Sequence, residues 1–223
     1  MISFINVTKK FDNLEILKNF SIEFKENEIT CLFGPSGVGK TTIANIAAGL
    51  LPVEDGEIRC VENALYSYVF QEPRLLEWYS VYQNIDFVLK NVYDNEKRVS
   101  IINNYINMVE LTGYEDYLPK ALSGGMCQRV SLARAFAYPS NFLILDEPFK
   151  GLDLKLKNEM ISMFKKLWQT GKRTVLFITH DVDEAVTLSD SIYIIKNRPV
   201  EIVEKLHISA ENKNEVKNIL LNI

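Results

Sequence analysis

A glycine-rich segment between an apolar stretch and a helical pattern constrains the fold of this chain more than any other feature. It reads Gly34-Pro35-Ser36-Gly37-Val38-Gly39-Lys40-Thr41. Glycines allow positive φ, so the backbone N–H groups of such a turn can approach an anion closely. Ile29–Phe33 before it is typical of a short buried strand, and Thr41–Leu50 after it predicts a helix that ends at Pro52. The context therefore predicts a phosphate-binding loop, the P-loop, at a helix N-terminus.

The polar side chains of this loop have separate expected tasks. Lys40 would place a point charge beside the terminal phosphates, and the Thr41 hydroxyl would reach Mg²⁺. The residues expected to bind the nucleotide run from Gly34 to Thr42. The alternative is a glycine-rich turn that precedes a lysine by chance, and the strand-loop-helix context disfavours it.

A pair of carboxylates follows a second apolar strand. Phe142–Leu145 predicts a fully buried strand, with Asp146 and Glu147 at its carboxyl end. Open α/β sheets bind their ligands at that end of the strands. Successive side chains of an extended chain point in different directions. Asp146 would therefore orient Mg²⁺, and Glu147 would face the attacking water as a general base. The alternative is an ordinary Asp-Glu-Pro surface turn.

A third segment is difficult to explain within one nucleotide site. It reads Leu122-Ser123-Gly124-Gly125-Met126-Cys127-Gln128-Arg129. Ser123 is a favoured N-cap, and the two glycines would leave the first helical N–H groups uncovered, as at an anion site. One nucleotide does not need two such sites from one chain, so the segment indicates a second nucleotide-bearing molecule. A plain capped helix is the alternative. The helix N-terminus could also lower the pKa of the Cys127 thiol, although an inert thiol is the simpler interpretation.

Together, these motifs resemble those of the ATP-binding cassette (ABC) ATPases, in order and spacing, over essentially the whole chain. The resemblance implies an α/β fold: a P-loop NTPase (RecA-like) core with an antiparallel β subdomain and an inserted α-helical subdomain. It implies one ABC ATPase domain over residues 1–223. Residues of about 1–70 and 140–223 would form the catalytic core with the β subdomain, and about 71–139 the helical subdomain that carries the signature motif.

The resemblance also implies roles for single residues. Gln71 matches the Q-loop glutamine, which binds Mg²⁺ and senses the membrane partner. His180, after the apolar Val175–Ile178, matches the switch histidine that contacts the γ-phosphate. Asp153 matches the D-loop aspartate, and Phe11 lies where the family places an aromatic ring that stacks on adenine. Taken alone, these residues could equally be a loop glutamine, a structural histidine and a core phenylalanine.

In the family, two cassettes pack head to tail. Each ATP then lies between the P-loop of one copy and the signature motif of the other, with Mg²⁺. The resemblance therefore implies that a second copy of the chain is a partner, and that its signature residues contact ATP. These residues are Ser123, Gly124, Gly125 and Gln128.

Several variants look like the nitrate/sulfonate/taurine-type importer branch. They are Met126 in the signature motif, the D-loop Lys150–Asp153, and the segments Phe70–Trp78 and Asn197–Val203. This implies an ATPase subunit that powers import of a small solute, with transmembrane permease subunits and an extracytoplasmic solute-binding protein as partners. The apolar segment 73–82 would receive a short helix of the permease. An exporter, a lipoprotein-release system or a non-transport ABC ATPase remains open, and no residue names the cargo.

Composition limits the alternatives. The net charge is −4 and there is no basic tail, which argues against a nucleic-acid partner. No apolar run approaches the roughly 18 residues that span a bilayer. Met1–Lys10 has no signal-peptide layout. We therefore expect a cytoplasmic protein, peripheral on the inner face of the cell membrane. The sequence leaves strand pairing over residues 56–71 open.

Overall fold

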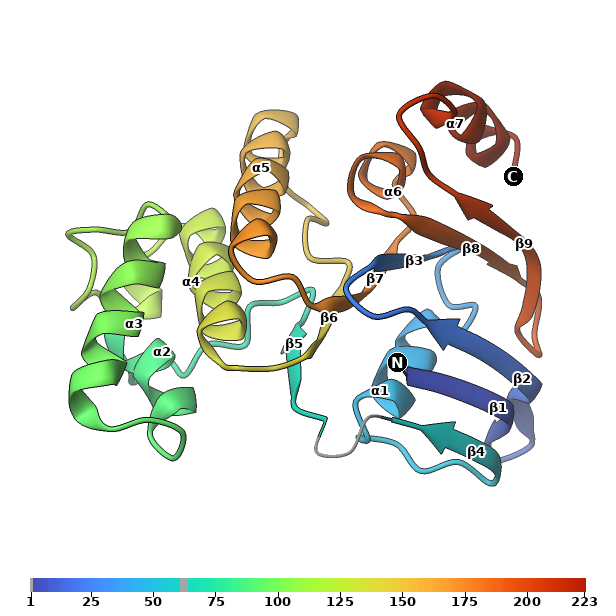
Figure 1. Cartoon of the computed structure of the whole chain (residues 1–223), viewed down its shortest axis with the longest axis horizontal. Coiled ribbons are helices and arrows are strands. Elements are labelled where there is room, and N and C mark those ends of the chain that lie inside the picture. Colours follow the sequence, from blue (N-terminus) through green and yellow to red (C-terminus); the bar gives the residue numbers. More distant parts are fainter. Residues whose placement is uncertain (1, 61–63) are drawn as a thin grey trace. The chain divides into compact units, whose positions relative to one another are not determined.

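The computed structural model describes residues 2–60 and 64–223, which form two compact units (Figure 1). The first unit comprises Met1–Tyr66, Asn141–Glu147 and Lys172–Ile223, and the second comprises Ser67–Ser140 and Pro148–Gly171. Strand β5 (Tyr66–Val69) spans the point in the sequence where one unit passes into the other. Within the segment 56–71, whose pairing was left open, residues 61–63 lie outside the described residues.

The first unit begins with an antiparallel sheet, as the family resemblance implies. Strands β1 (Ile2–Phe11) and β2 (Leu14–Phe24) form a hairpin around Asp12, which has a φ of 52°. Strand β4 (Asp55–Arg59) pairs with the other side of β1, so the order is β2-β1-β4. Asp and Asn tolerate left-handed backbone, which explains the turn at Asp12-Asn13.

A largely parallel sheet forms the centre of the same unit. The strands of this sheet that belong wholly to the first unit are, in spatial order, β6 (Phe142–Asp146), β7 (Thr174–Thr179), β3 (Ile29–Phe33), β8 (Ser191–Lys196) and the antiparallel β9 (Glu201–His207). Every residue of β3, β6 and β7 is buried. Continuous apolar strands of this kind are typical of parallel sheets covered on both faces.

Strand register brings three strand ends to one edge of this sheet. Phe33 pairs with Thr179, and Asp146 pairs with Ile178. The residues that follow β3, β6 and β7 therefore leave the sheet at the same level. This is the edge at which open α/β sheets bind ligands.

Aromatic packing joins the two sheets of the first unit. Phe24 makes edge-to-face contacts with Phe4 at 6.1 Å and with Phe142 at 5.7 Å between ring centroids. Such pairs stabilise by about 0.5–1.5 kcal/mol beyond the apolar area they bury. The helices of this unit are α1 (Lys40–Ala47), α6 (Val182–Leu188) and α7 (Lys213–Leu221).

Helix α1 is shorter than predicted. Gly49 adopts a φ of 71°, and the N–H of Leu50 donates to the Asn45 carbonyl at 2.8 Å. A left-handed glycine followed by this hydrogen bond is a common helix C-terminus. Gly49 rather than Pro52 therefore ends the helix.

The second unit is built from helices, as the family resemblance implies. They are α2 (Val81–Leu89), α3 (Asn95–Met108), a 3₁₀ turn at Pro119–Ala121, α4 (Gly124–Ala137) and α5 (Leu154–Thr170). Helix α4 contacts α2, α3 and α5, and Phe136 meets Phe164 edge-to-face at 5.8 Å. This unit includes residues 148–171 besides the range expected for a helical subdomain, whose boundaries stay a prediction. No helix among the described residues is long and apolar enough to span a membrane.

Candidate active site

The predicted P-loop joins the carboxyl end of β3 to α1. Gly39 is the N-cap of α1 with a φ of 129°, a conformation that non-glycine residues rarely adopt. Lys40 is only 4% exposed, and its Nζ donates to the carbonyl oxygens of Gly34 at 2.7 Å and Pro35 at 2.8 Å. The lysine side chain thus folds back over its own loop.

Close packing of the loop explains two of its glycines. A Cβ on Gly34 would lie 2.3 Å from the Ile195 carbonyl oxygen. A Cβ on Gly39 would lie 2.8 Å from methyl groups of both Ile16 and Val200. Real Cβ atoms do not approach other heavy atoms this closely. Packing against β8, β2 and the segment after β8 therefore requires glycine at positions 34 and 39.

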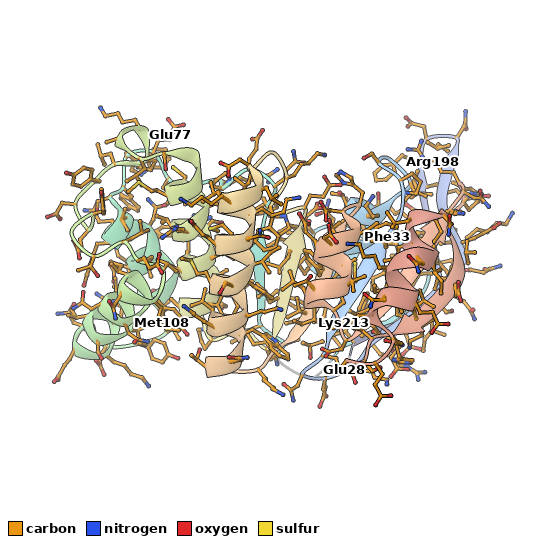
Figure 2. All side chains as sticks on the ribbon, turned by 90° about the horizontal axis from the view of Figure 1, so that it is seen from above. Glu28, Phe33, Glu77, Met108, Arg198 and Lys213 are labelled. Carbon is orange, nitrogen blue, oxygen red and sulfur yellow. The ribbon has the colours of Figure 1, made fainter. Side chains whose placement is uncertain are left out.

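One contact to the P-loop was not predicted. Arg198, in the turn between β8 and β9, donates from its guanidinium to the Gly37 carbonyl oxygen. Figure 2 labels Arg198 and also Phe33, the last residue of β3 before the loop. Arg198 follows Gly37 by 161 residues, and no local pattern links them. An arginine beside a phosphate cradle carries the right charge for an anion, but in the sequence this segment stands out only as a branch variant.

Glu147 and His180 lie together at the ligand-binding edge. The Nδ1 atom of His180 is 3.4 Å from Oε1 of Glu147. The His180 side chain is 48% exposed and that of Glu147 is 10% exposed. Glu147 has a φ of 47°, and its N–H donates to the Ile178 carbonyl at 3.0 Å. Left-handed backbone at a non-glycine residue is uncommon and clusters at functional sites.

The remaining predicted residues of the first unit are at the surface or at strand ends. Asp146 is the buried last residue of β6. Thr41 is exposed and Thr42 half-buried in the first turn of α1. Phe11 ends β1 and is 44% exposed. Lys9 Nζ lies 5.3 Å from the Phe11 ring centroid and pairs with Glu54 Oε1 at 2.7 Å.

The signature motif begins helix α4 in the second unit. Ser123 is the N-cap, and its Oγ accepts from the Met126 N–H at 3.2 Å. A Cβ on Gly124 would meet no described heavy atom within 4 Å. A Cβ on Gly125 would lie 2.8 Å from Cδ2 of Leu156. The two glycines therefore differ: Gly125 is needed for packing within the chain, whereas the space over Gly124 is open.

Three other predicted residues of this unit lie apart from the glycine turn or already serve the fold. Gln128 is 3% exposed, and its Nε2 donates to the Pro148 carbonyl at 2.7 Å. The Asp153 carboxylate is the N-cap of α5 and accepts from the Leu156 N–H at 3.0 Å. Gln71 is exposed shortly after β5.

The structure thus gathers the P-loop, Asp146, Glu147 and His180 at one edge of the first unit. Gln71, Ser123, Gly124, Gly125, Gln128 and Asp153 belong to the second.

The cysteines behave as buried or surface thiols. Burial raises the pKa of the Cys31 thiol to about 12. Burial also raises the pKa of the Cys127 thiol. The helix N-terminus therefore does not produce a low thiol pKa at Cys127, and the inert-thiol interpretation holds.

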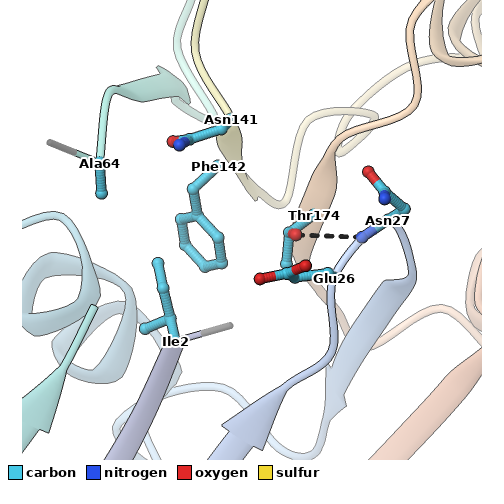
Figure 3. A pocket seen from close by; sticks show the side chains of 7 residues that line it. All are labelled: Ile2, Glu26, Asn27, Ala64, Asn141, Phe142 and Thr174. Atoms are coloured by element: carbon cyan, nitrogen blue, oxygen red, sulfur yellow. Dashed lines mark hydrogen bonds between the residues drawn. The ribbon is translucent and has the colours of Figure 1, made fainter. Parts of the chain in front are cut away.

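A pocket of about 220 Å³ lies at the opposite end of the parallel strands. It is lined by Ile2, Glu26, Asn27, Ala64, Asn141, Phe142 and Thr174 (Figure 3). Phe142 and Thr174 are the first residues of β6 and β7, and the Asn27 N–H donates to Thr174 Oγ1 at 3.1 Å. None of these seven residues belongs to the predicted site.

Comparison with known proteins agrees with the fold and motifs. A family model for the ABC transporter matches residues 17–150. An uncharacterized ABC transporter ATP-binding protein of Methanocaldococcus jannaschii is 40% identical over 96% of this chain and 84% of its own length. An aliphatic sulfonates import ATP-binding protein of Pseudomonas syringae pv. tomato is 37% identical over 96% of this chain and 90% of its own. The chain therefore belongs to the ABC transporter family.

Solved structures define the fold further. The dimeric structure of a bacterial ABC transporter cassette matches with a TM-score of 0.83 and 28% identity, over 94% of this chain and all of that one. A post-hydrolysis dimer bound to ADP and Pi matches with a TM-score of 0.81 and 27% identity, over the same shares. The predicted P-loop NTPase fold is confirmed. The chain is an ATP-binding subunit of an ABC transporter and an ATPase.

Proposed function

We propose that this chain powers the import of a small solute of the nitrate, sulfonate or taurine type. The support is the 37% identity to an aliphatic sulfonates import protein over 96% of the chain. The variants at Met126 and Lys150–Asp153 point the same way. The chain would be cytoplasmic and peripheral on the inner face of the cell membrane, bound to transmembrane permease subunits. An extracytoplasmic solute-binding protein would complete the system.

The catalytic site is shared between two copies that pack head to tail. The single observation that carries this proposal is the open space over Gly124, where a Cβ would meet no described atom within 4 Å. Ser123 and Gly124 are both exposed at the N-terminus of α4, a helix of 14 residues. Helix N-termini favour anions. The γ-phosphate held by the P-loop of the other copy is the anion that this proposal assigns to the space.

The reaction is the attack of water on the γ-phosphate of ATP. The water oxygen bonds to the γ-phosphorus, and the bond from that phosphorus to the bridging oxygen breaks, which releases ADP and phosphate. Glu147 accepts the proton of the attacking water. Lys40 and the N–H groups of the loop stabilise the charge on the phosphates. His180, beside Glu147, contacts the γ-phosphate.

The residues of the first unit suit Mg²⁺. The Thr41 hydroxyl and the Asp146 carboxylate are hard oxygen donors, which is the chemistry that Mg²⁺ prefers. When bound, the ion would neutralise charge on the β- and γ-phosphates. Gln71 is proposed as a third Mg²⁺ donor through the family resemblance. On the same basis, Asp153 keeps its proposed D-loop role and Phe11 its proposed stacking on adenine. Gln128 keeps its place among the proposed signature residues on that basis, and its Nε2 also donates to the Pro148 carbonyl.

An exposed aromatic patch is the proposed docking surface for the permease. We define the aromatic patch as Trp78, Tyr79 and Phe87. Trp78 is 71% exposed and Phe87 is 51% exposed. Tyr79 lies between them, with ring centroids 6.2 Å from Trp78 and 5.9 Å from Phe87. Exposed apolar surface of this kind marks an interaction site, and a short amphipathic helix of the permease would cover it.

Two buried or half-buried side chains hold the loop that carries this patch. Asn84 is fully buried; it accepts from the Leu76 N–H and donates to the carbonyls of Leu76, Tyr79 and Ser80. Arg134, from α4, donates to the carbonyls of Pro73 and Arg74 at 3.1 Å. The loop is thus formed before a partner arrives, which lowers the entropic cost of docking.

A complementation experiment tests the shared site. Lys40→Ala removes the P-loop charge, and Ser123→Arg blocks the signature turn, so each variant alone is expected to be inactive. In a head-to-tail heterodimer, one of the two sites combines an intact P-loop with an intact signature turn. A mixture of the two variants should recover up to about a quarter of the wild-type rate, because half of the random dimers hold one intact site in two. No recovery, with dimers shown to form by cross-linking, would contradict the proposal.

A further inference from the structure

A closed set of hydrogen bonds surrounds His180 at the end of strand β7. The hydroxyl of Thr179 donates to Oε2 of Glu184 at 2.6 Å. The N–H of Asp181 donates to that same hydroxyl oxygen at 3.0 Å, and the N–H of Glu184 donates to Oδ1 of Asp181 at 3.0 Å. Thr179 thus uses its hydroxyl as both donor and acceptor. We call these three residues the hydroxyl ring.

His180 is the single residue of the chain between two members of the hydroxyl ring. Thr179 is the last residue of β7, and Asp181 is the N-cap of α6. The residues on both sides of His180 are therefore hydrogen-bonded to the same buried residue, Glu184, and to each other through the Thr179 hydroxyl. Its imidazole stays 48% exposed, with Nδ1 at 3.4 Å from Glu147 Oε1.

The arrangement differs from an ordinary capping box at the start of α6. Asp181 and Glu184 have the spacing of a capping box, in which the third helical residue accepts from the N-cap N–H. Here that N–H goes to Thr179, and the Glu184 carboxyl accepts from the hydroxyl instead. An ordinary cap needs neither the threonine nor burial, yet Thr179 is 2% exposed and Glu184 is 3% exposed. Burying a carboxyl group is costly unless it is hydrogen-bonded, and the Thr179 hydroxyl supplies such a bond to Glu184.

We propose that Glu184 is a positioning residue for His180, which it holds in place through Thr179 and Asp181. The inference rests on the proposed function, because it presupposes that His180 acts on the γ-phosphate. Glu184 touches neither nucleotide nor water in this role. It determines where the backbone leaves β7, and hence whether the imidazole reaches the position beside Glu147. A misplacement of about 1 Å costs on the order of a hundredfold in rate at a catalytic group.

A double-mutant cycle with His180 tests this inference in the full-length chain. Thr179→Val keeps the side-chain shape but removes the hydroxyl. We expect kcat for ATP hydrolysis to fall by about tenfold, the equivalent of one lost hydrogen bond, with KM for ATP changed less than about threefold. Thr179→Ser restores the hydroxyl and should recover most of kcat. On a His180→Ala background, Thr179→Val should add less than about a twofold loss.

The outcomes separate the inference from the function on which it rests. Equal losses from Thr179→Val with and without His180 would overturn the positioning role, since the ring would then act independently of the histidine. Wild-type kcat in His180→Ala would overturn the proposed role of His180 and, with it, this inference.

A second variant covers the case in which Thr179→Val fails to fold. Glu184→Gln keeps the volume and one acceptor oxygen, and its weaker neutral acceptor should lower kcat by about two- to fivefold. If Glu184→Gln lowers kcat by the same factor on the His180→Ala background, the inference is overturned. If Glu184→Gln has no effect on kcat on that background, the inference is supported.

Discussion

His180 and Glu147 approach each other from adjacent strands, with Nδ1 of the imidazole 3.4 Å from Oε1 of the carboxylate. Each follows the last residue of its strand, and these strands, β6 and β7, pair in parallel with Asp146 opposite Ile178. Glu147 is further held by the hydrogen bond from its N–H to the Ile178 carbonyl. At this distance the two side chains can act on the same phosphate group. The carboxylate would activate the attacking water, and the imidazole would lie beside the phosphate.

Replacement of Glu147 should separate binding from hydrolysis. Glu147→Gln keeps the side-chain volume but removes the group that accepts the proton of water. We expect ATP hydrolysis to fall by about 10²- to 10⁴-fold, the usual contribution of a general base, with ATP affinity nearly unchanged. Phosphate release and equilibrium nucleotide binding measure the two quantities. Normal turnover in this variant would exclude Glu147 as the base.

The two signature glycines should respond differently to alanine. Gly124→Ala meets no described atom of its own chain, and alanine favours helix, so the free energy of unfolding should stay the same or rise by up to about 1 kcal/mol. Hydrolysis should nevertheless fall by at least about tenfold, because the methyl group would occupy the space assigned to the γ-phosphate. Gly125→Ala should lower stability by about 1 kcal/mol, since Leu156 must move. Thermal unfolding and ATPase assays on both variants make the comparison. Unchanged hydrolysis in a stable Gly124→Ala chain would contradict the shared site.

Asn84 should control the order of the loop below the aromatic patch. Asn84→Ala leaves the Leu76 N–H without its side-chain partner and should cost about 1–3 kcal/mol. Hydrogen exchange at residues 76–80 should then accelerate by about tenfold or more. Asn104→Ala is the control, because that exposed asparagine lies in α3 and donates to Met108 Sδ rather than to the loop. Equal exchange rates in the two variants would show that Asn84 does not hold the loop.

The aromatic patch itself should decide the response to the permease. Trp78→Glu places a charge where an apolar helix would dock, and its 71% exposure means that the isolated chain should fold normally. Stimulation of hydrolysis by the reconstituted permease should be lost or fall by about tenfold or more. The control is Leu221→Glu, a substitution at an exposed leucine in α7, outside the patch. Full stimulation of Trp78→Glu would refute the docking surface.

Thiol reactivity should follow burial. Cys31 is fully buried and its pKa is raised to about 12, so it should resist alkylation at pH 8 until the chain unfolds. The thiol is stabilised in its neutral form by burial, and it would ionise only as the pH approaches that value. Cys60 is exposed and should react first. Mass spectrometry after timed treatment with iodoacetamide gives the order, and early labelling of Cys31 would contradict the packing of β3.

Some site residues could be predicted because their signal is local. Gly34–Thr41 and Asp146-Glu147 each follow an apolar strand, and the strand and the polar residues are adjacent in the sequence. Contacts between distant segments could not be predicted in this way. Nothing near Gly37 indicates Arg198, and the Asp181–Glu184 spacing predicts a capping box rather than the ring through Thr179. The end of α1 also differs from the prediction, because the left-handed Gly49 ends the helix before Pro52.

The sequence by itself determined which chemistry this chain can perform, because the P-loop, the strand-end carboxylates and the signature turn are each short runs of neighbouring residues. Their backbone conformations depend mainly on local preferences. Only the tertiary structure decided which of these side chains meet. The register of β3, β6 and β7 places Glu147 beside His180, and the packing of β8 on the loop requires Gly34. Strand pairing joins residues far apart along the chain, so its outcome depends on the burial of whole strands rather than on any local run.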